Sequence, residues 1–173
     1  MNRTISLCSL IVGLMLFASC GKNTNGISNA NIYYEVILKK SNQSWQKFKK
    51  ANSNSYQYKV QFVSWTGWSW ETTITVINGK VSKRSFELKY SGETTDSWIE
   101  FENEIGINEG GAEPLTLDQI YDKAKKEWLI KRENAELFFE TDEDGLISLC
   151  GYVEKYCMDD CFIGIRISYI GPA

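Results

Sequence analysis

The spacing of apolar side chains changes along the chain and divides it into helices and strands. At positions 32–51 apolar residues recur every three or four residues, which predicts a helix with a possible break at 41–44. At 56–62 aromatic and aliphatic residues alternate with polar ones, which is typical of a half-buried strand. By the same criteria we expect strands at 70–77, 80–90, 135–141, 146–153 and 162–169, and a second helix at 115–131.

Two local motifs mark the ends of these elements. Asn78-Gly79 separates two of the expected strands and favours a two-residue type I′ hairpin, because both turn positions need a positive φ. Thr116 and Gln119 have the spacing of a capping box, which predicts that the second helix begins just after Thr116.

Residues 91–113 differ from the rest of the chain, with seven acidic residues and no basic one. Trp98, Phe101 and Ile105 lie at helical steps, so we expect a short helix followed by a flexible acidic loop. The expected order is therefore helix, three strands, helix, three strands. Tight turns imply antiparallel pairing, so we predict an α+β fold: one domain at 32–173, an antiparallel sheet of about six strands, and helices packed on it.

The first twenty residues have the features of an export signal. Arg3 precedes a mostly apolar run at 5–17, which is shorter than the roughly 20 residues needed to span a membrane. Small residues at 18–19 precede Cys20, and this arrangement resembles the lipobox of bacterial lipoproteins, with Phe17 where leucine is usual. The resemblance implies a signal peptide at 1–19, cleavage before Cys20 and acylation of Cys20. A plain secretory signal with an incidental cysteine is the alternative.

Residues 20–31 are polar and contain almost nothing to bury, so we expect a lipidated, flexible tether. A flexible segment of about eleven residues spans roughly 18 Å, which keeps the domain close to the bilayer. Lipoproteins of this type carry several acyl chains, which makes the anchor effectively permanent. No acidic run follows Cys20, and by resemblance to sorting rules this predicts an outer-membrane lipoprotein facing the periplasm, with the cell surface as the alternative.

Composition excludes several kinds of chemistry. The chain has no histidine, which removes Ser-His-Asp and Cys-His nucleophiles and histidine metal sites. Its net charge of −3 argues against a nucleic-acid partner. Asp142 begins a segment like a calcium loop, but Val153 stands where such a loop needs a glutamate. We therefore expect a hairpin turn there, no metal and no cofactor.

Three cysteines remain in the folded part, Cys150, Cys157 and Cys161, which is an odd number for an oxidising compartment. One disulfide and one free thiol are the simplest arrangement. Ile147 and Leu149 are expected to face the core, which points Cys150 outward, whereas Cys161 is expected to point inward with the last strand. Opposite faces disfavour a Cys150–Cys161 bond, so the sequence favours Cys157–Cys161 without fixing the pairing.

Three tryptophans, Trp65, Trp68 and Trp70, surround one predicted turn. Aromatic rings displayed on a rim bind glycans or partner proteins well, because they offer large rigid apolar area at little cost in entropy. The alternative is that the three rings cap the open end of the core.

Six lysines and no acidic residue lie between positions 36 and 70. Because this stretch follows the tether, its lysines could face anionic lipid headgroups at about 1 kcal/mol each. The lysines concerned are Lys39, Lys40, Lys47, Lys49 and Lys50. The alternative is an ordinary solvated helix face.

Short motifs are spread along the chain: Trp45, Tyr56-x-Tyr58, Val76-Ile77-Asn78-Gly79-Lys80-Val81, Thr116-Leu117-Asp118-Gln119-Ile120-Tyr121 and Asp159-Asp160. In this combination the chain resembles a family of small, uncharacterised bacterial secreted proteins and lipoproteins. It departs from the family at 64–68, where many members have Cys-x-Cys, and at 145–147, where many have a proline. The family has no established activity, so the resemblance implies the fold more than the function.

Taken together, the sequence favours a non-enzymatic, membrane-anchored module of the cell envelope that binds a protein or glycan, and it offers no catalytic residue. The binding surface is expected on the sheet face, on residues 91–113 or at the tryptophan turn. The alternative is a small envelope hydrolase that acts on glycan or peptide through paired carboxylates, which would need a concave pocket with convergent acids of perturbed pKa.

Overall fold

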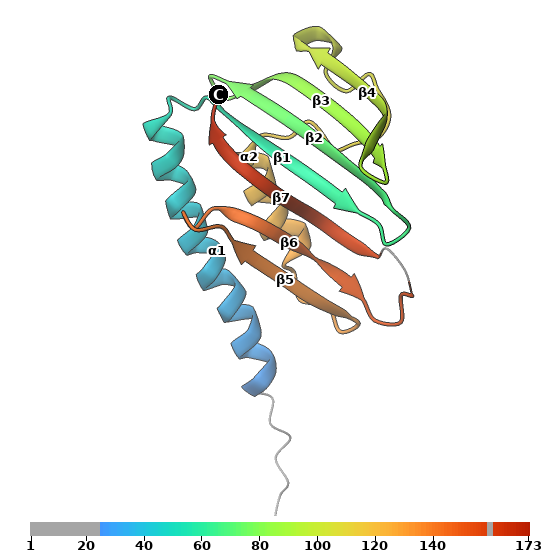
Figure 1. Cartoon of the computed structure of the whole chain (residues 1–173). Helices are drawn as coiled ribbons and strands as arrows, with labels where there is room; N and C mark the ends of the chain where they lie inside the picture. Colours follow the sequence, from blue (N-terminus) through green and yellow to red (C-terminus); the bar gives the residue numbers. More distant parts are fainter. Residues whose placement is uncertain (1–24, 159–160) are drawn as a thin grey trace, which may run out of the picture.

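The alternating segments form one antiparallel sheet in the order β4-β3-β2-β1-β7-β6-β5 (Figure 1). The computed structural model describes residues 25–158 and 161–173, with side chains from residue 32; the signal segment, Cys20 and Asp159-Asp160 lie outside the described residues. The α+β class is confirmed, with seven strands rather than about six. The strands are β1 (Tyr56–Val63), β2 (Trp68–Ile77), β3 (Lys80–Tyr90), β4 (Glu93–Phe101), β5 (Ala135–Thr141), β6 (Ile147–Glu154) and β7 (Phe162–Pro172).

The additional strand is β4, where the sequence had predicted a short helix. Ser91-Gly92 forms a two-residue turn with φ values of 50° and 88°, so β3 turns back directly into β4. Along β4, Glu100 is buried whereas its neighbours Ile99 and Phe101 are more than half exposed, which is the two-residue period of a strand. Only the single 3-10 turn η1 (Glu102–Glu104) follows it.

The second helix, α2 (Leu117–Lys123), begins at the predicted capping box. Thr116 Oγ1 accepts a hydrogen bond from the backbone N–H of Gln119 at 3.3 Å, and Gln119 Oε1 accepts one from the backbone N–H of Thr116 at 2.8 Å. The helix then widens into a π-helical turn, η2 (Ala124–Trp128), and ends earlier than the predicted residue 131.

The first helix, α1 (Asn25–Ala51), is longer than predicted and continuous. Residues 25–31, assigned from the sequence to the flexible tether, are helical, and the expected break at 41–44 is absent. Ser41 lies on the buried face, where its hydroxyl is 2.7 Å from that of Tyr121 in α2. The small side chain therefore allows close helix packing and does not interrupt the helix.

Both helices pack on the same face of the sheet and share one core with it. Trp45 from α1 and Ile120 from α2 are fully buried there, as is Tyr56 at the start of β1. Burial fades toward the other end of β1, where Phe62 is only half-buried. The helices thus cover one end of this inner face and leave the end near the β1–β2 turn partly open.

Candidate functional site

The motif residues found in the sequence converge on the start of α2. Tyr56 Oη accepts a hydrogen bond from the backbone N–H of Leu117 at 2.8 Å, and Tyr58 Oη donates to a backbone carbonyl just before the helix. Trp45 Nε1 donates to Asp118 Oδ1 at 2.9 Å. Burial raises the pKa of Tyr56 to about 12, so its hydroxyl stays protonated at neutral pH. These motifs form a structural junction between helix and sheet.

Two of the three candidate tryptophans are exposed. Trp65 lies at the β1–β2 turn with 85% of its surface exposed, and Trp68 is 42% exposed, whereas Trp70 is half-buried and packs against the core. Among the described residues, no ring contact joins these three indoles to one another. Trp65 therefore does not cap the core, whereas Trp70 packs against it.

The tryptophans belong to a larger aromatic surface. Register pairs Phe62 with Trp70, whose ring centroids are 6.0 Å apart, and Trp68 with Tyr90, whose centroids are 4.8 Å apart. These four side chains share the inner face with the buried core and continue it past the region that the helices cover. We define the aromatic patch as Phe62, Trp65, Trp68, Trp70 and Tyr90. Exposed rings of this kind are typical of binding surfaces.

A cleft of about 660 Å³ opens beside the aromatic patch, where β1 and β7 separate. The two strands pair only as far as Val60 and Ile167, next to a bulge at Ser168 of β7. A bulge bends the strand that carries it. This cleft was not predicted from the sequence, although two of the residues that line it, Trp70 and Cys161, were among the candidate site residues.

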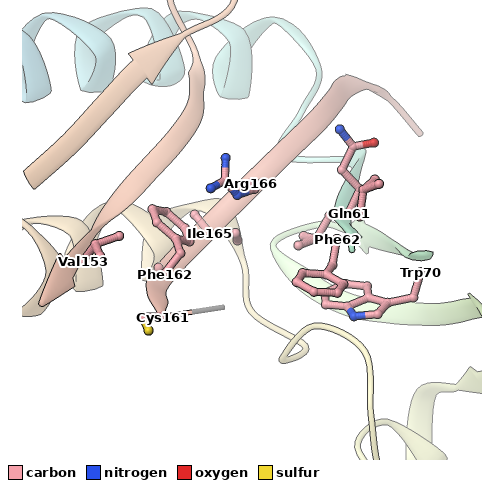
Figure 2. Close-up of a pocket in the computed structure, with 11 residues that line it drawn as sticks. Gln61, Phe62, Trp70, Val153, Cys161, Phe162, Ile165 and Arg166 are labelled. Carbon is pink, nitrogen blue, oxygen red and sulfur yellow. The ribbon is translucent and has the colours of Figure 1, made fainter. Parts of the chain in front are cut away.

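The two sides of the cleft differ in chemistry, as Figure 2 shows. The rings of Phe62 and Trp70 point to one side, and the guanidinium of Arg166 and the amide of Gln61 point to the other. Arg166 is exposed and lies over the ring of Phe162, with its Cζ 4.4 Å from the ring centroid. No carboxylate pairs with Arg166 among the described residues.

Cys157 and Cys161 are joined in a disulfide, the pairing that the sequence favoured, with their Cα atoms 6.0 Å apart. The bond closes the loop between β6 and β7, and Cys161 is half-buried at the start of β7. The disulfide therefore lies at the edge of the cleft.

Cys150 is fully buried in the core, so the expectation that it points outward is wrong. Register pairs β6 with β5 on both sides of Ser148 but leaves Ser148 itself without an opposite residue. This bulge inverts the alternation of side-chain directions beyond it, so Cys150 joins Ile147 in the main core cluster, whereas Leu149 is buried outside that cluster. Burial also raises the pKa of the Cys150 thiol to about 12.

The acidic loop after β4 is tied to the sheet, which corrects the expectation of a flexible loop. Glu100 accepts hydrogen bonds from the backbone N–H groups of Gly106 at 2.8 Å and Asn108 at 2.7 Å, and it pairs with Arg84 at 3.2 Å. Arg84 also donates to the carbonyl of Ala112 at 2.9 Å. The Arg84 and Glu100 side chains are only 4% and 1% exposed, so the pair is shielded from water.

The acids with shifted pKa are not poised for proton transfer. Burial would raise the pKa of Glu100, but the bonds from Gly106, Asn108 and Arg84 hold it below its usual range. Burial would likewise raise that of Asp118, but bonds from Lys49 and Trp45 lower it. A general acid at neutral pH needs a raised pKa.

Within the described part of the chain, no three potential ligands gather into a metal site.

The outer face of α1 carries the predicted lysines, with one exception. Lys49 forms an ion pair with Asp118 at 2.6 Å, which ties it to α2 and removes it from the lipid-facing set. The others, Lys39, Lys40, Lys47 and Lys50, are exposed. Closer to the N-terminus, Ile32, Tyr33 and Val36 are each more than half exposed.

No helix among the described residues is both long and apolar enough to cross a membrane.

Comparison with known proteins found no family model, curated protein or solved structure that matches this chain.

Proposed function

We propose that the protein is a non-enzymatic binding module of the bacterial cell envelope, anchored to the outer membrane through acylated Cys20. It binds a partner protein or glycan through the aromatic patch and the adjoining cleft. The observation that carries this proposal is the exposure of Trp65 and Trp68 in an aromatic patch whose members Phe62 and Trp70 line a cleft of about 660 Å³. Large rings left in water next to a concave surface are more typical of recognition than of packing.

The arrangement of the patch supports binding by a preformed surface. Trp68 rests on Tyr90 and Trp70 rests on Phe62, so most of the rings are already held in place. Binding to such rings costs little conformational entropy. Trp65 makes no ring contact among the described residues and is free to close over a bound partner.

Membrane anchoring is supported by the lipobox-like sequence and by the outer face of α1. Apolar Ile32 and Val36, followed by four exposed lysines on the same side of the helix, suit contact with an anionic bilayer surface. We therefore propose that this face of α1 lies against the headgroups.

The binding role is tested by site-specific photo-crosslinking in bacteria that express the full chain. A benzophenone amino acid at position 65 or 68 is expected to trap a defined envelope protein or glycan. The same residue in place of the remote, exposed Lys125 serves as the control. Identical adducts from all positions, or none from 65 and 68, would contradict the proposal.

The anchor is tested separately. Mass spectrometry of the purified protein is expected to show an acylated N-terminal Cys20, and a Cys20→Ser variant is expected to leave the membrane fraction.

For the α1 face, the double variant Lys39→Glu/Lys40→Glu should bind less to vesicles of phosphatidylglycerol and phosphatidylethanolamine. Lys125→Glu/Lys131→Glu is the charge-matched control. Equal vesicle binding by both double variants would rule out a specific role for α1.

A further inference from the structure

The cleft is bounded by an edge of β1 and an edge of β7 that, in the described part of the chain, pair with no strand across the cleft. β1 and β7 pair from Tyr56–Pro172 to Val60–Ile167, and their pairing does not continue beyond that point. In the part of the chain that the structure describes, residues 61–63 of β1 and 162–166 of β7 have no strand partner on the cleft side. Such edges present open backbone donors and acceptors that can template another strand.

The ladder identifies which backbone groups face the cleft. Ser64 N donates to Trp68 O of β2, and the hydroxyl of Ser168 in β7 donates to Lys59 O. Because successive residues of a strand direct their N–H and C=O to alternate sides, Gln61 and Val63 direct theirs into the cleft.

The same reasoning applies to β7. Val60 directs its backbone groups toward β2, so its opposite residue Ile167 directs its own away from β1. The N–H and C=O of Gly164 and Arg166 then face the cleft. In the described part of the chain, each edge therefore has two residues whose backbone N–H and C=O are not used in strand pairing.

The side chains around the cleft match an extended segment whose residues alternate. An extended chain points successive side chains to opposite faces. The side chains on one face of such a segment would pack against the rings of Phe62 and Trp70. Those on its other face would lie beside Gln61 and Arg166 (Figure 2). Arg166 has no carboxylate partner among the described residues, so an acidic side chain complements it.

We infer that the cleft binds an extended polypeptide segment of a partner protein, with apolar and acidic residues in alternation, which adds as a strand to the open edges of β1 and β7. Backbone hydrogen bonds would supply affinity, and the aromatic and cationic sides of the cleft would supply selectivity. This inference rests on the proposed function and names the partner as a protein.

The first test uses a defined peptide library against the purified full chain in detergent. The probes are acetylated octapeptides with Val, Ile, Phe or Tyr at odd positions and Asp, Glu, Ser or Lys at even positions. We expect the retained peptides to be enriched in Asp and Glu. Methylation of internal backbone nitrogens in the best peptide should weaken binding at least tenfold, because it removes ladder donors. Absence of enrichment, or binding that is insensitive to methylation, would overturn the inference.

The second test changes the charge of the cleft. Arg166→Glu is expected to weaken binding of the acidic peptide at least tenfold and to improve binding of its lysine counterpart, whereas Arg166→Lys should retain most of the affinity. Lys125→Glu is the matched control, since it makes the same charge change at an exposed residue that does not line the cleft. Equal effects of Arg166→Glu and Lys125→Glu would overturn the assignment.

The third test addresses the backbone of β1. Gln61→Pro removes the N–H that faces the cleft, at an edge position where proline is tolerated, and Gln61→Ala keeps this N–H while removing the side chain. We expect Gln61→Pro to weaken peptide binding several-fold more than Gln61→Ala. Unchanged tryptophan fluorescence must first show that Gln61→Pro is folded; if it is not, the methylated peptides decide the question of backbone pairing.

The outcomes separate this inference from the proposed function. Crosslinks from positions 65 and 68 together with an unenriched library would leave the binding role standing and reject strand addition. Library binding that depends on Arg166, without crosslinks from those positions, would support strand addition and reject the role of the exposed tryptophans.

Discussion

The buried pair of Arg84 and Glu100 gives the most quantitative prediction for this fold. We expect Glu100→Gln to destabilise the protein by about 3 kcal/mol. Removal of one partner from a buried ion pair costs roughly 3–5 kcal/mol, because the other charge stays buried without compensation. The lower value applies here because Arg84 keeps carbonyl partners in the loop, Ala112 at 2.9 Å and Asn108 at 3.3 Å.

The measurement is equilibrium unfolding of the full chain in urea, followed by tryptophan fluorescence. Trp98 is a suitable reporter because the Arg84 guanidinium lies 4.5 Å from its ring centroid. A loss of about 3 kcal/mol corresponds to a fall in melting temperature of roughly 6–12 °C for a domain of this size. Glu109→Gln is the control, because Glu109 is an exposed acid in the same loop. If Glu100→Gln destabilises no more than Glu109→Gln, the pair does not hold the loop.

The pair also predicts a pH dependence. The folded-state pKa of Glu100 lies below its ordinary value of 4.5, so its contribution to stability is complete above that pH. The contribution is lost as the pH falls through the lowered folded-state value. The difference in unfolding free energy between wild type and Glu100→Gln should therefore shrink below about pH 4.5. A difference that stayed constant down to pH 2 would contradict this assignment.

Three further predictions concern local features. Thr116→Ala should cost about 1 kcal/mol in urea unfolding through loss of the helix cap, and Thr116→Ser should restore most of it. The buried Cys150 thiol, whose pKa is raised to about 12, should react with a thiol reagent at pH 8 only after denaturation; rapid labelling of the native protein would contradict its burial. Gly79→Ala should destabilise more than Gly92→Ala, because both need positive φ but only at Gly79 would a Cβ meet Asn54. Equal losses for the two glycine variants would show that backbone strain alone sets the cost.

The features that were predicted correctly from sequence depend on the chemistry of neighbouring residues. The positive φ of Asn78-Gly79 and the capping box at Thr116 each need only a few adjacent side chains to agree. For this reason the hairpin, the start of α2 and the α+β class followed from the sequence, whereas the end of α2 at a π turn did not.

The missed strand β4 shows how the helical and the strand spacing of apolar side chains can be confused over a short segment. Trp98 and Phe101 lie three residues apart, which fits one turn of a helix, yet along β4 Phe101 and Ile99 are exposed whereas Glu100 is buried. A buried charge at this position gave no hydrophobic signal. Its partner, Arg84, lies in β3, and only the pairing of the two strands brings them together. The turn at Ser91-Gly92 was the one available local signal.

The candidate site depends on bulges, and a bulge is a property of two strands. Ser148 and Ser168 are unremarkable in sequence, because nothing local distinguishes a serine in a regular strand from one that is left without an opposite residue. The first turns Cys150 inward, and the second lies at the last pair of β1 and β7. Trp65 and Trp68 could be singled out from sequence as candidate binding residues, which stays a prediction, but the cleft lined by Phe62 and Trp70 could not be foreseen.

The site combines an anchored and an open part of the same sheet face. Toward α2, the Arg84–Glu100 pair holds the acidic loop over the inner face, where the Thr72 hydroxyl accepts a hydrogen bond from the backbone N–H of Ala112 at 3.0 Å. At the other end, the pairing of β1 and β7 stops next to the Ser168 bulge, so no strand in the described part of the chain pairs with the edge beside Phe62. Closing this edge within the chain would bury the apolar wall of the cleft and satisfy its backbone. Because the described part of the chain leaves both open, a partner that supplied a strand and apolar side chains would gain both contributions at once.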